Sequence, residues 1–311
     1  MPSSMPRNPE LEAAAFADTT NHDAWRVYAD WLQAQGDARG ELILLSLHEG
    51  GAFLSEKRAY ETRRKANEAA MTREWKDWAR KVGAGTNSEF GFSRGLLEQV
   101  SGSLANLAPH LDALFEMAPV HKLVLSHCKP ADLLALFGRR PAWLGRLSYL
   151  KFEASPKIDA KCLNALASNP LPELDGINLT ACAIDRSCCA ALAGLQSHKL
   201  RRVVLTANAI DDEALPSLLA AEHRTQWRKL YLTGNPLGDE GLATLAHDPG
   251  LAELEQLYLR QIEAEFTDLA VFADRKALPG LRVLEVEAGW NADRPTKKAL
   301  QARFGKGLRG V

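Results

Sequence analysis

The most regular feature of the chain is a spacing of apolar and polar positions with the form L-x-x-L-x-L-x-x-N. Seven segments follow this pattern, and their fourth positions fall at Leu123, Leu150, Ile177, Val203, Leu230, Leu257 and Leu284. The differences between successive position numbers are 27, 27, 26, 27, 27 and 27. A period this steady indicates one supersecondary unit that is repeated along the chain.

The L-x-L core of each unit predicts a short strand, because alternate side chains then point to opposite faces and the leucines share the buried one. After the strand the chain must turn, and the ninth position favours a small polar side chain that hydrogen-bonds backbone groups inside the turn. The residues at this position are Cys128, Ser155, Cys182, Asn208, Asn235, Ile262 and Gly289. The last two depart from the rule, so we expect an irregular turn near the C-terminal end.

Helical spacing follows each strand, for example in residues 211–222 and 238–249. Leucine and alanine recur there at three- and four-residue intervals, as a helix with one buried face requires. Acidic residues such as Asp211, Asp212, Asp239 and Glu240 start these stretches and match the positive end of the helix dipole.

One strand and one helix cannot bury their apolar sides alone, whereas stacked units can. The predicted fold class is therefore α/β, a solenoid with a parallel β-sheet on its concave side and helices on its convex side. A doubly wound sheet is the alternative, but its units rarely share one motif at a fixed period. The pattern resembles the leucine-rich repeat family, and the unit length with a full helix resembles the ribonuclease-inhibitor subtype. The resemblance covers residues 96–290.

The N-terminal part does not follow the repeat. Trp25, Tyr28, Trp31 and Leu32 share one face of a predicted helix, and Gly36 suits its C-terminal end. A second helix is expected from Glu41, and residues 55–82 read as a long, highly charged helix.

The string "RVYADWLQAQGDARGELILL" is similar to a short helical domain that precedes leucine-rich repeats in some bacterial proteins, the repeat-companion domain. The segment "GFSRGLLEQV" resembles the bridge into the first repeat of those proteins, and "ALQARFGKGL" resembles their closing segment. The resemblance implies a helical capping domain in residues 1–85, a solenoid in 86–290 and a C-terminal cap with a basic tail in 291–311. The aromatic face of the first domain is expected to cover the apolar flank of the first repeat. A helical domain that binds a partner is the alternative.

Composition adds little to this picture. The chain has 311 residues and a formal net charge of −1, so bulk charge favours no particular partner. The first residues do not read as a secretory signal, and no run of 18 apolar residues predicts a membrane span. Five cysteines without framework spacing favour free thiols and a cytoplasmic location.

The sequence contains no Walker loop, G-x-G-x-x-G after a strand, H-E-x-x-H or G-x-S-x-G motif, so neither an enzyme nor a bound cofactor is predicted. Cys182, Cys188 and Cys189 lie close together, but the repeat explains them as turn and helix positions, and no metal site is expected. The eight histidines are scattered and suggest no catalytic group.

The third, fifth and seventh positions of each unit should face outward on the concave sheet. They hold three of the five tyrosines and several basic residues, which are side chains typical of binding surfaces. The candidate partner-binding residues are Tyr149, Lys151, Asn178, Arg202, Lys229, Tyr231, Tyr258 and Arg260. Because tyrosine favours strands and lysine is a common exposed residue, an ordinary surface remains the alternative.

Two further basic clusters occur. One, with Lys57, Arg58, Arg63, Arg64 and Lys65, is interleaved with glutamates and reads as a solvated helix face. The other lies near the C-terminus and contains Arg294, Lys297, Lys298, Arg303, Lys306 and Arg309. A solvated cap is the simpler interpretation of the second cluster, and contact with nucleic acid or an acidic protein is the alternative.

The sequence therefore predicts a non-catalytic scaffold or adaptor that binds a partner protein, with an acidic patch on that partner, through the concave face. A regulator of a partner enzyme such as a small GTPase is the first alternative, and nucleic-acid binding, which the neutral charge disfavours, is the second. The partner, the pathway, the oligomeric state and the choice among the concave face, the helical domain and the basic tail stay open.

Overall fold

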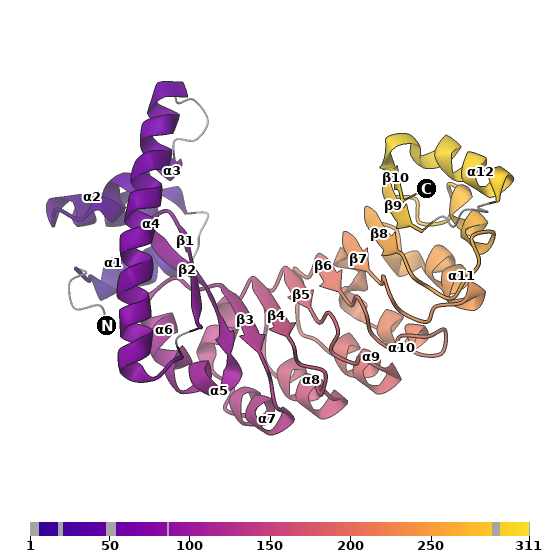
Figure 1. Cartoon of the computed structure of the whole chain (residues 1–311), viewed down its shortest axis with the longest axis horizontal. Coiled ribbons are helices and arrows are strands. Elements are labelled where there is room, and N and C mark those ends of the chain that lie inside the picture. Colours follow the sequence, from indigo (N-terminus) through magenta and orange to yellow (C-terminus); the bar gives the residue numbers. More distant parts are fainter. Residues whose placement is uncertain (1–5, 18–20, 48–53, 86, 288–292, 311) are drawn as a thin grey trace. The chain divides into compact units, whose positions relative to one another are not determined.

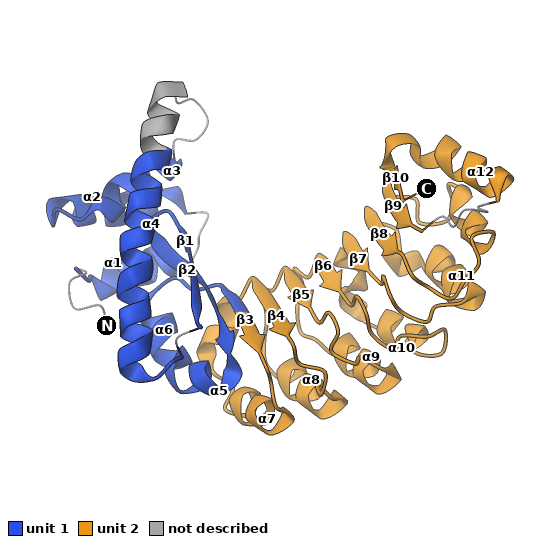
Figure 2. Cartoon of the chain, viewed as in Figure 1, with its two compact units in different colours: residues 1–123 blue, residues 124–311 orange. Residues whose placement is uncertain are grey.

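A computed structural model describes residues 6–17, 21–47, 54–85, 87–287 and 293–310, without the side chains of residues 17 and 54–60. The chain forms two compact units, residues 1–123 (unit 1) and residues 124–311 (unit 2), which Figure 2 shows in different colours. The domain boundaries predicted at residues 85 and 290 follow the sequence pattern rather than compactness, and they stay predictions.

Unit 1 is mainly helical and contains one antiparallel hairpin. Its elements are α1 (Pro9–Ala17), α2 (His22–Ala34), α3 (Ala38–Leu47), α4 (Leu54–Val82), β1 (Glu89–Ser93), β2 (Leu96–Ser103), α5 (Leu104–Leu107), the 3₁₀ helix η1 (Ala108–His110) and α6 (Leu111–Met117). The next strand, β3 (Lys122–Ser126), spans the boundary between the units.

The predicted aromatic face of α2 forms the core of the helical part. Trp25 and Tyr28 are buried and pack with Ile43 of α3 and Leu96 of β2. Gly36 has φ 71°, the left-handed conformation that commonly ends a helix. Residues of the neighbouring helices of unit 1 therefore cover most of this aromatic face. Leu96 is the residue that the hairpin contributes to the same core.

The segment "GFSRGLLEQV" forms the hairpin. Arg94 and Gly95 make its turn with φ of 54° and 72°, as a two-residue type I′ turn requires. The Arg94 guanidinium lies 5.2 Å from the ring centre of Trp25. A Cβ on Gly95 would lie 2.9 Å from Cδ1 of Leu42, so the hairpin tip packs closely against α3.

Unit 2 alternates helices and strands. The helices are α7 (Pro130–Gly138), α8 (Ala160–Ala167), α9 (Arg186–Ala193), α10 (Leu215–Leu219), α11 (Asp239–His247) and α12 (Arg294–Phe304). The strands are β4 (Tyr149–Glu153), β5 (Gly176–Asn178), β6 (Arg202–Val204), β7 (Lys229–Tyr231), β8 (Gln256–Leu259), β9 (Val283–Val286) and β10 (Leu308–Arg309). The 3₁₀ helices are η2 (Ala142–Arg146), η3 (Glu222–Gln226), η4 (Pro249–Leu251), η5 (Asp268–Ala273) and η6 (Gly305–Gly307).

The strands of unit 2 pair in parallel in chain order, and the repeat sets their register. Each fourth position pairs with the fourth position of the next unit, from Leu150 through Ile177, Val203, Leu230 and Leu257 to Leu284. These side chains are at most 2% exposed. Within unit 2 the strands follow the inner side of an arc and the helices its outer side (Figure 1). The predicted mixed α/β fold class is confirmed.

The ninth position hydrogen-bonds the backbone, as expected. Asn208 Oδ1 accepts from the backbone N–H groups of Cys182 and Ile184, both at 3.0 Å, and its Nδ2 donates to the carbonyls of Leu179 and Leu205, both at 2.9 Å. These partners belong to two successive units, so each such side chain ties its own turn to the preceding one.

The eighth position has a property that the sequence did not show. His127, Ala154, Ala181, Ala207, Gly234 and Gln261 all have φ between 45° and 71°. A left-handed conformation costs a residue with a side chain roughly 1 kcal/mol or more, and only one of these six is glycine. The turn after each strand is therefore held by its hydrogen bonds rather than by residues that prefer the conformation.

Aspartate side chains cap the N-termini of helices α8, α9 and α12 in unit 2. Asp159 accepts from the backbone N–H of Cys162, and Asp185 accepts from that of Cys188, each at 2.9 Å. These hydrogen bonds hold the pKa of both carboxyl groups below its ordinary value. Asp212 instead reaches into the next unit, where Oδ1 accepts from Gly238 N–H at 2.8 Å, at the start of α11.

The C-terminal units depart from the regular pattern. Helix α10 is shorter than the predicted 211–222, because Ala221 adopts an extended conformation and starts a 3₁₀ helix. After β8, residues 268–273 form a 3₁₀ helix in place of an α-helix. Ile262 offers no polar group at the ninth position, which fits the expected irregularity, and Gly289 lies outside the described residues.

Candidate functional site

The register of unit 2 places all eight candidate residues on one face of the sheet, opposite the buried leucines. Third positions pair with third positions across the strands, as Arg202 does with Lys229, and fifth positions pair with fifth, as Tyr231 does with Tyr258. The eight side chains are all half-buried or exposed. They divide into one group on β4 and β5 and a second group on β6 to β8.

Tyr231 and Tyr258 form the most ordered part of the second group. Their ring planes are 7° apart and their ring centres 4.0 Å apart. The Tyr258 hydroxyl donates to Gln256 Oε1 at 2.9 Å. Partial burial, together with hydrogen bonding to Tyr258, raises the pKa of Tyr231 to about 12, so its hydroxyl is neutral at physiological pH.

The basic residues of the face differ in whether an acidic side chain neutralises them. Lys151 lies 2.5 Å from a carboxylate oxygen of Glu153, and Arg260 lies 3.8 Å from one of Glu285. Arg202 and Lys229 form no ion pair with any carboxylate that the structure describes. Of the four basic candidate residues, the two that keep an uncompensated positive charge are therefore this pair, next to the two tyrosines.

The group on β4 and β5 is organised around a glycine. A Cβ on Gly176 would lie 2.8 Å from Cδ2 of Tyr149, so the tyrosine ring covers the space that a side chain would need. Asn178 Nδ2 lies 3.4 Å from the Tyr149 hydroxyl, and Asn178 Oδ1 accepts from Thr180 N–H and Oγ1 at 3.0 and 2.8 Å. These contacts hold Tyr149 and Asn178 on the same face as the tyrosine pair but leave the two groups separate.

The sequence pattern predicted which residues share the outward face of the sheet, but it did not predict the ion pairs between them. The signal for one pair was present, because Lys151 and Glu153 are two residues apart on a strand and so share a face. The other pair links Arg260, which follows β8 directly at the seventh position of its repeat, to Glu285 in β9 at the fifth position of the next repeat. Such diagonal contacts depend on side-chain conformation, which the repeat pattern does not specify.

The two other basic clusters are partly committed to internal contacts. Arg303 donates to the backbone carbonyls of Phe272, Asp274 and Leu278, the last at 2.7 Å. Arg64 pairs with Glu68 at 2.7 Å, and Arg63 pairs with Glu41. The side chains of Lys57 and Arg58 lie outside the described residues. The three hydrogen bonds of Arg303 fix α12 to η5 and to the residues that follow it.

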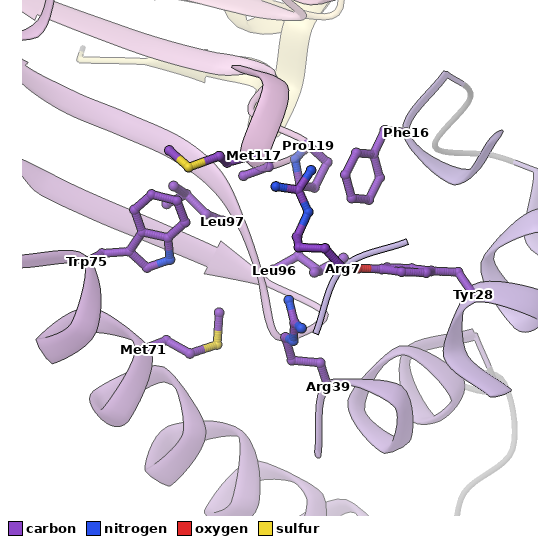
Figure 3. A pocket seen from close by; sticks show the side chains of 11 residues that line it. Arg7, Phe16, Tyr28, Arg39, Met71, Trp75, Leu96, Leu97, Met117 and Pro119 are labelled. Atoms are coloured by element: carbon purple, nitrogen blue, oxygen red, sulfur yellow. The ribbon is translucent and has the colours of Figure 1, made fainter. Parts of the chain in front are cut away.

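Polar side chains also meet inside unit 1, at a cavity of about 20 Å³ between α2, α4 and β2 (Figure 3). Arg7 and Arg39 line it and pair with Glu12 and Asp37 at 2.6 and 2.8 Å. Trp75 Nε1 is buried at its wall and has no hydrogen-bond partner among the described atoms. The cavity has room for about one water molecule, which would satisfy this N–H group.

The cysteine side chains are buried and protonated at neutral pH. All five cysteines are buried thiols, and burial raises the pKa of each to about 11 or 12. In the part of the chain that the structure describes, no three His, Cys, Asp or Glu residues are arranged to hold a metal ion.

Comparison with protein-family models gives no match, and comparison with curated proteins gives no significant match. Of the helices described, none is both long and apolar enough to cross a membrane. The function of the chain is therefore inferred from its own residues.

Proposed function

We propose that this protein is a leucine-rich repeat solenoid with an N-terminal repeat-companion domain, and that it binds a partner protein without catalysing a reaction. The solenoid is supported by the steady period of the repeat, by the in-register parallel strands of unit 2 and by the Asn208 bonds that join successive turns. A cytoplasmic location belongs to the same proposal, supported by five free thiols, which are typical of reducing compartments.

The observation that carries the binding proposal is the stacked pair Tyr231 and Tyr258 beside the uncompensated pair Arg202 and Lys229. Tyrosine and arginine dominate the energetics of many interfaces, because each combines a large contact area with a polar end. The side chains stand on a hydrogen-bonded sheet, so a partner would bind them with little loss of conformational entropy.

Affinity capture from the native lysate tests this proposal. The bait is the full chain, compared with the Tyr231→Ala/Tyr258→Ala double variant, and each captured protein is then purified and its affinity measured directly. The matched control is Val283→Ala, which shortens a half-buried side chain on the neighbouring strand β9 and leaves both tyrosine rings in place. We expect the double variant to lose the partner and the control to keep it. Equal affinity of a purified partner for wild type and double variant would contradict the proposal.

A further inference from the structure

The stacked tyrosines have a direction that bears on what can bind them. Neighbouring strands lie about 4.8 Å apart, and the two parallel rings stack across that gap with their centres 4.0 Å apart. The stack therefore runs from β7 to β8, and the second ring face of Tyr231 points toward β6. The β6 residue paired with Tyr231 is Val204, a half-buried side chain far shorter than a phenol ring.

The surroundings of Val204 form a seat on the sheet. Arg202 and Thr206 flank it, two residues before and after, and this spacing puts them on the same face. Asn178 of β5 pairs with Val204 on the side opposite Tyr231. Its amide oxygen already accepts two hydrogen bonds from Thr180, which fixes this side chain. We call Val204, Tyr231, Asn178, Arg202 and Thr206 the Val204 seat.

The size of the seat matches a planar group. Tyr231 and Asn178 stand on strands that are two spacings, about 9.6 Å, apart. A ring stacked on Tyr231 at the distance seen for Tyr258 would take up less than half of that width. Stacked or offset aromatic pairs are stabilised by about 0.5–1.5 kcal/mol beyond the area they bury.

The charge next to the seat selects the rest of the ligand. Arg202 and Lys229 are paired in register, so one carboxylate placed between them can contact both. Lys151 and Arg260, on either side, are already neutralised by Glu153 and Glu285. A nucleic acid needs a longer basic track, because its backbone repeats a charge at every nucleotide. A single positive centre fits one or two acidic side chains.

We propose that the Val204 seat binds an acidic segment of a partner protein, which inserts one aromatic side chain over Val204 as the third ring of the tyrosine stack. A neighbouring Asp or Glu carboxylate of that segment lies between Arg202 and Lys229. This inference rests on the proposed function and specifies the chemistry of its partner.

Fluorescence anisotropy with labelled synthetic peptides tests the inference. The probe is a tryptophan flanked on both sides by aspartate and glutamate, and it is compared with peptides in which alanine replaces the tryptophan or lysines replace the acids. A single-stranded oligonucleotide is the fourth probe. We expect the acidic tryptophan peptide to bind the full chain at least about tenfold more tightly than the other three.

The chain itself offers a blocking variant. Val204→Tyr should fill the seat with a third tyrosine of the protein's own stack, and it should weaken binding of the acidic tryptophan peptide at least about tenfold. Val283→Tyr is the matched control, because its paired residue on β8 is Gln256 rather than a stacked tyrosine, and it should leave binding unchanged. Arg202→Glu/Lys229→Glu reverses the charge beside the seat without filling it, and it should also abolish binding. This second variant protects the test against a misfolded Val204→Tyr protein.

Three results would overturn the inference: Val204→Tyr binding like wild type, the lysine peptide or the oligonucleotide binding as tightly as the acidic peptide, or no probe binding at all. The proposed function and the Val204 seat are distinguished by different variants. If a purified partner is lost by Tyr231→Ala/Tyr258→Ala but kept by Val204→Tyr and by Arg202→Glu/Lys229→Glu, only the inference about the seat fails. If the tyrosine double variant also keeps that partner, the proposed function fails as well.

Discussion

Tyr231 and Tyr258 lie at equivalent positions of successive repeats, on adjacent parallel strands, with ring planes 7° apart and ring centres 4.0 Å apart. The relationship follows from the register, because paired residues of a parallel sheet share a face and a height along the strand. An aromatic pair of this kind contributes to stability as well as offering a surface.

A double-mutant cycle measures that contribution. Tyr231→Ala, Tyr258→Ala and the double variant should give a coupling free energy of unfolding of about 1 kcal/mol, because each single change already removes the stack. Urea titration of the four proteins supplies the values. The cycle of Tyr149→Ala with Tyr258→Ala should show no coupling, since no contact joins these rings, and a coupling equal to that of the stacked pair would contradict the assignment.

Asn208→Ala should destabilise unit 2 by roughly 3 kcal/mol, because it leaves several buried backbone groups without partners. The change removes the acceptor for Cys182 and Ile184 N–H and the donor to the Leu179 and Leu205 carbonyls. The matched control is Asn164→Ala, which replaces an exposed asparagine on α8. This surface change should alter the free energy of unfolding by less than about 0.5 kcal/mol. Equal losses from both variants, measured by urea unfolding, would refute the role given to the ninth position.

Ala181→Gly should stabilise the protein, although glycine usually destabilises. Ala181 has φ 54° and an exposed side chain. Glycine therefore relieves about 1 kcal/mol or more of backbone strain against a smaller cost in unfolded-state entropy. The control Ala165→Gly changes the interior of α8 and should cost about 1 kcal/mol. Calorimetry should show a higher midpoint temperature of unfolding than wild type for Ala181→Gly and a lower one for Ala165→Gly. A lower midpoint for both variants would show that the eighth position is not strained.

His223 should make stability depend on pH below neutrality. Its Nε2 lies 3.2 Å from the Leu192 carbonyl and therefore donates, while its Nδ1 accepts from Trp227 Nε1 at 3.1 Å, so the buried ring is neutral. Burial, with a smaller contribution from His198, lowers the pKa of His223 below its ordinary 6.5.

The sign of the effect follows from this direction. The unfolded chain binds a proton at His223 near pH 6.5 and the folded chain only at lower pH, so the stabilisation is complete above about 6.5 and is lost as the pH falls further. Urea midpoints between pH 7.5 and 5 should fall more steeply for wild type than for His223→Gln, which keeps a neutral donor and acceptor. Parallel curves for the two proteins would rule out His223 as the source.

Much of the candidate site was predictable because it depends on two periods that are written in the sequence. The alternation of strand side chains separates Leu230 from Tyr231, and the period of the repeat brings Tyr231 beside Tyr258. The same logic predicted the hydrogen bonds of Asn208, because a small amide in a turn has few other groups to bond. Units that repeat a pattern must stack to bury their apolar faces, so local pattern and global register agree.

The tertiary structure decided what depends on contacts between units or on side-chain conformation. It paired Arg260 with Glu285 and left Arg202 and Lys229 without a carboxylate among the described residues, a difference that no one-dimensional spacing encodes. It also placed Arg303 against three backbone carbonyls, which turned a member of the predicted basic tail into a structural residue. A sequence records which charged residues are present. Whether two opposite charges lie close enough to neutralise each other is decided only when the strands and loops pack in three dimensions.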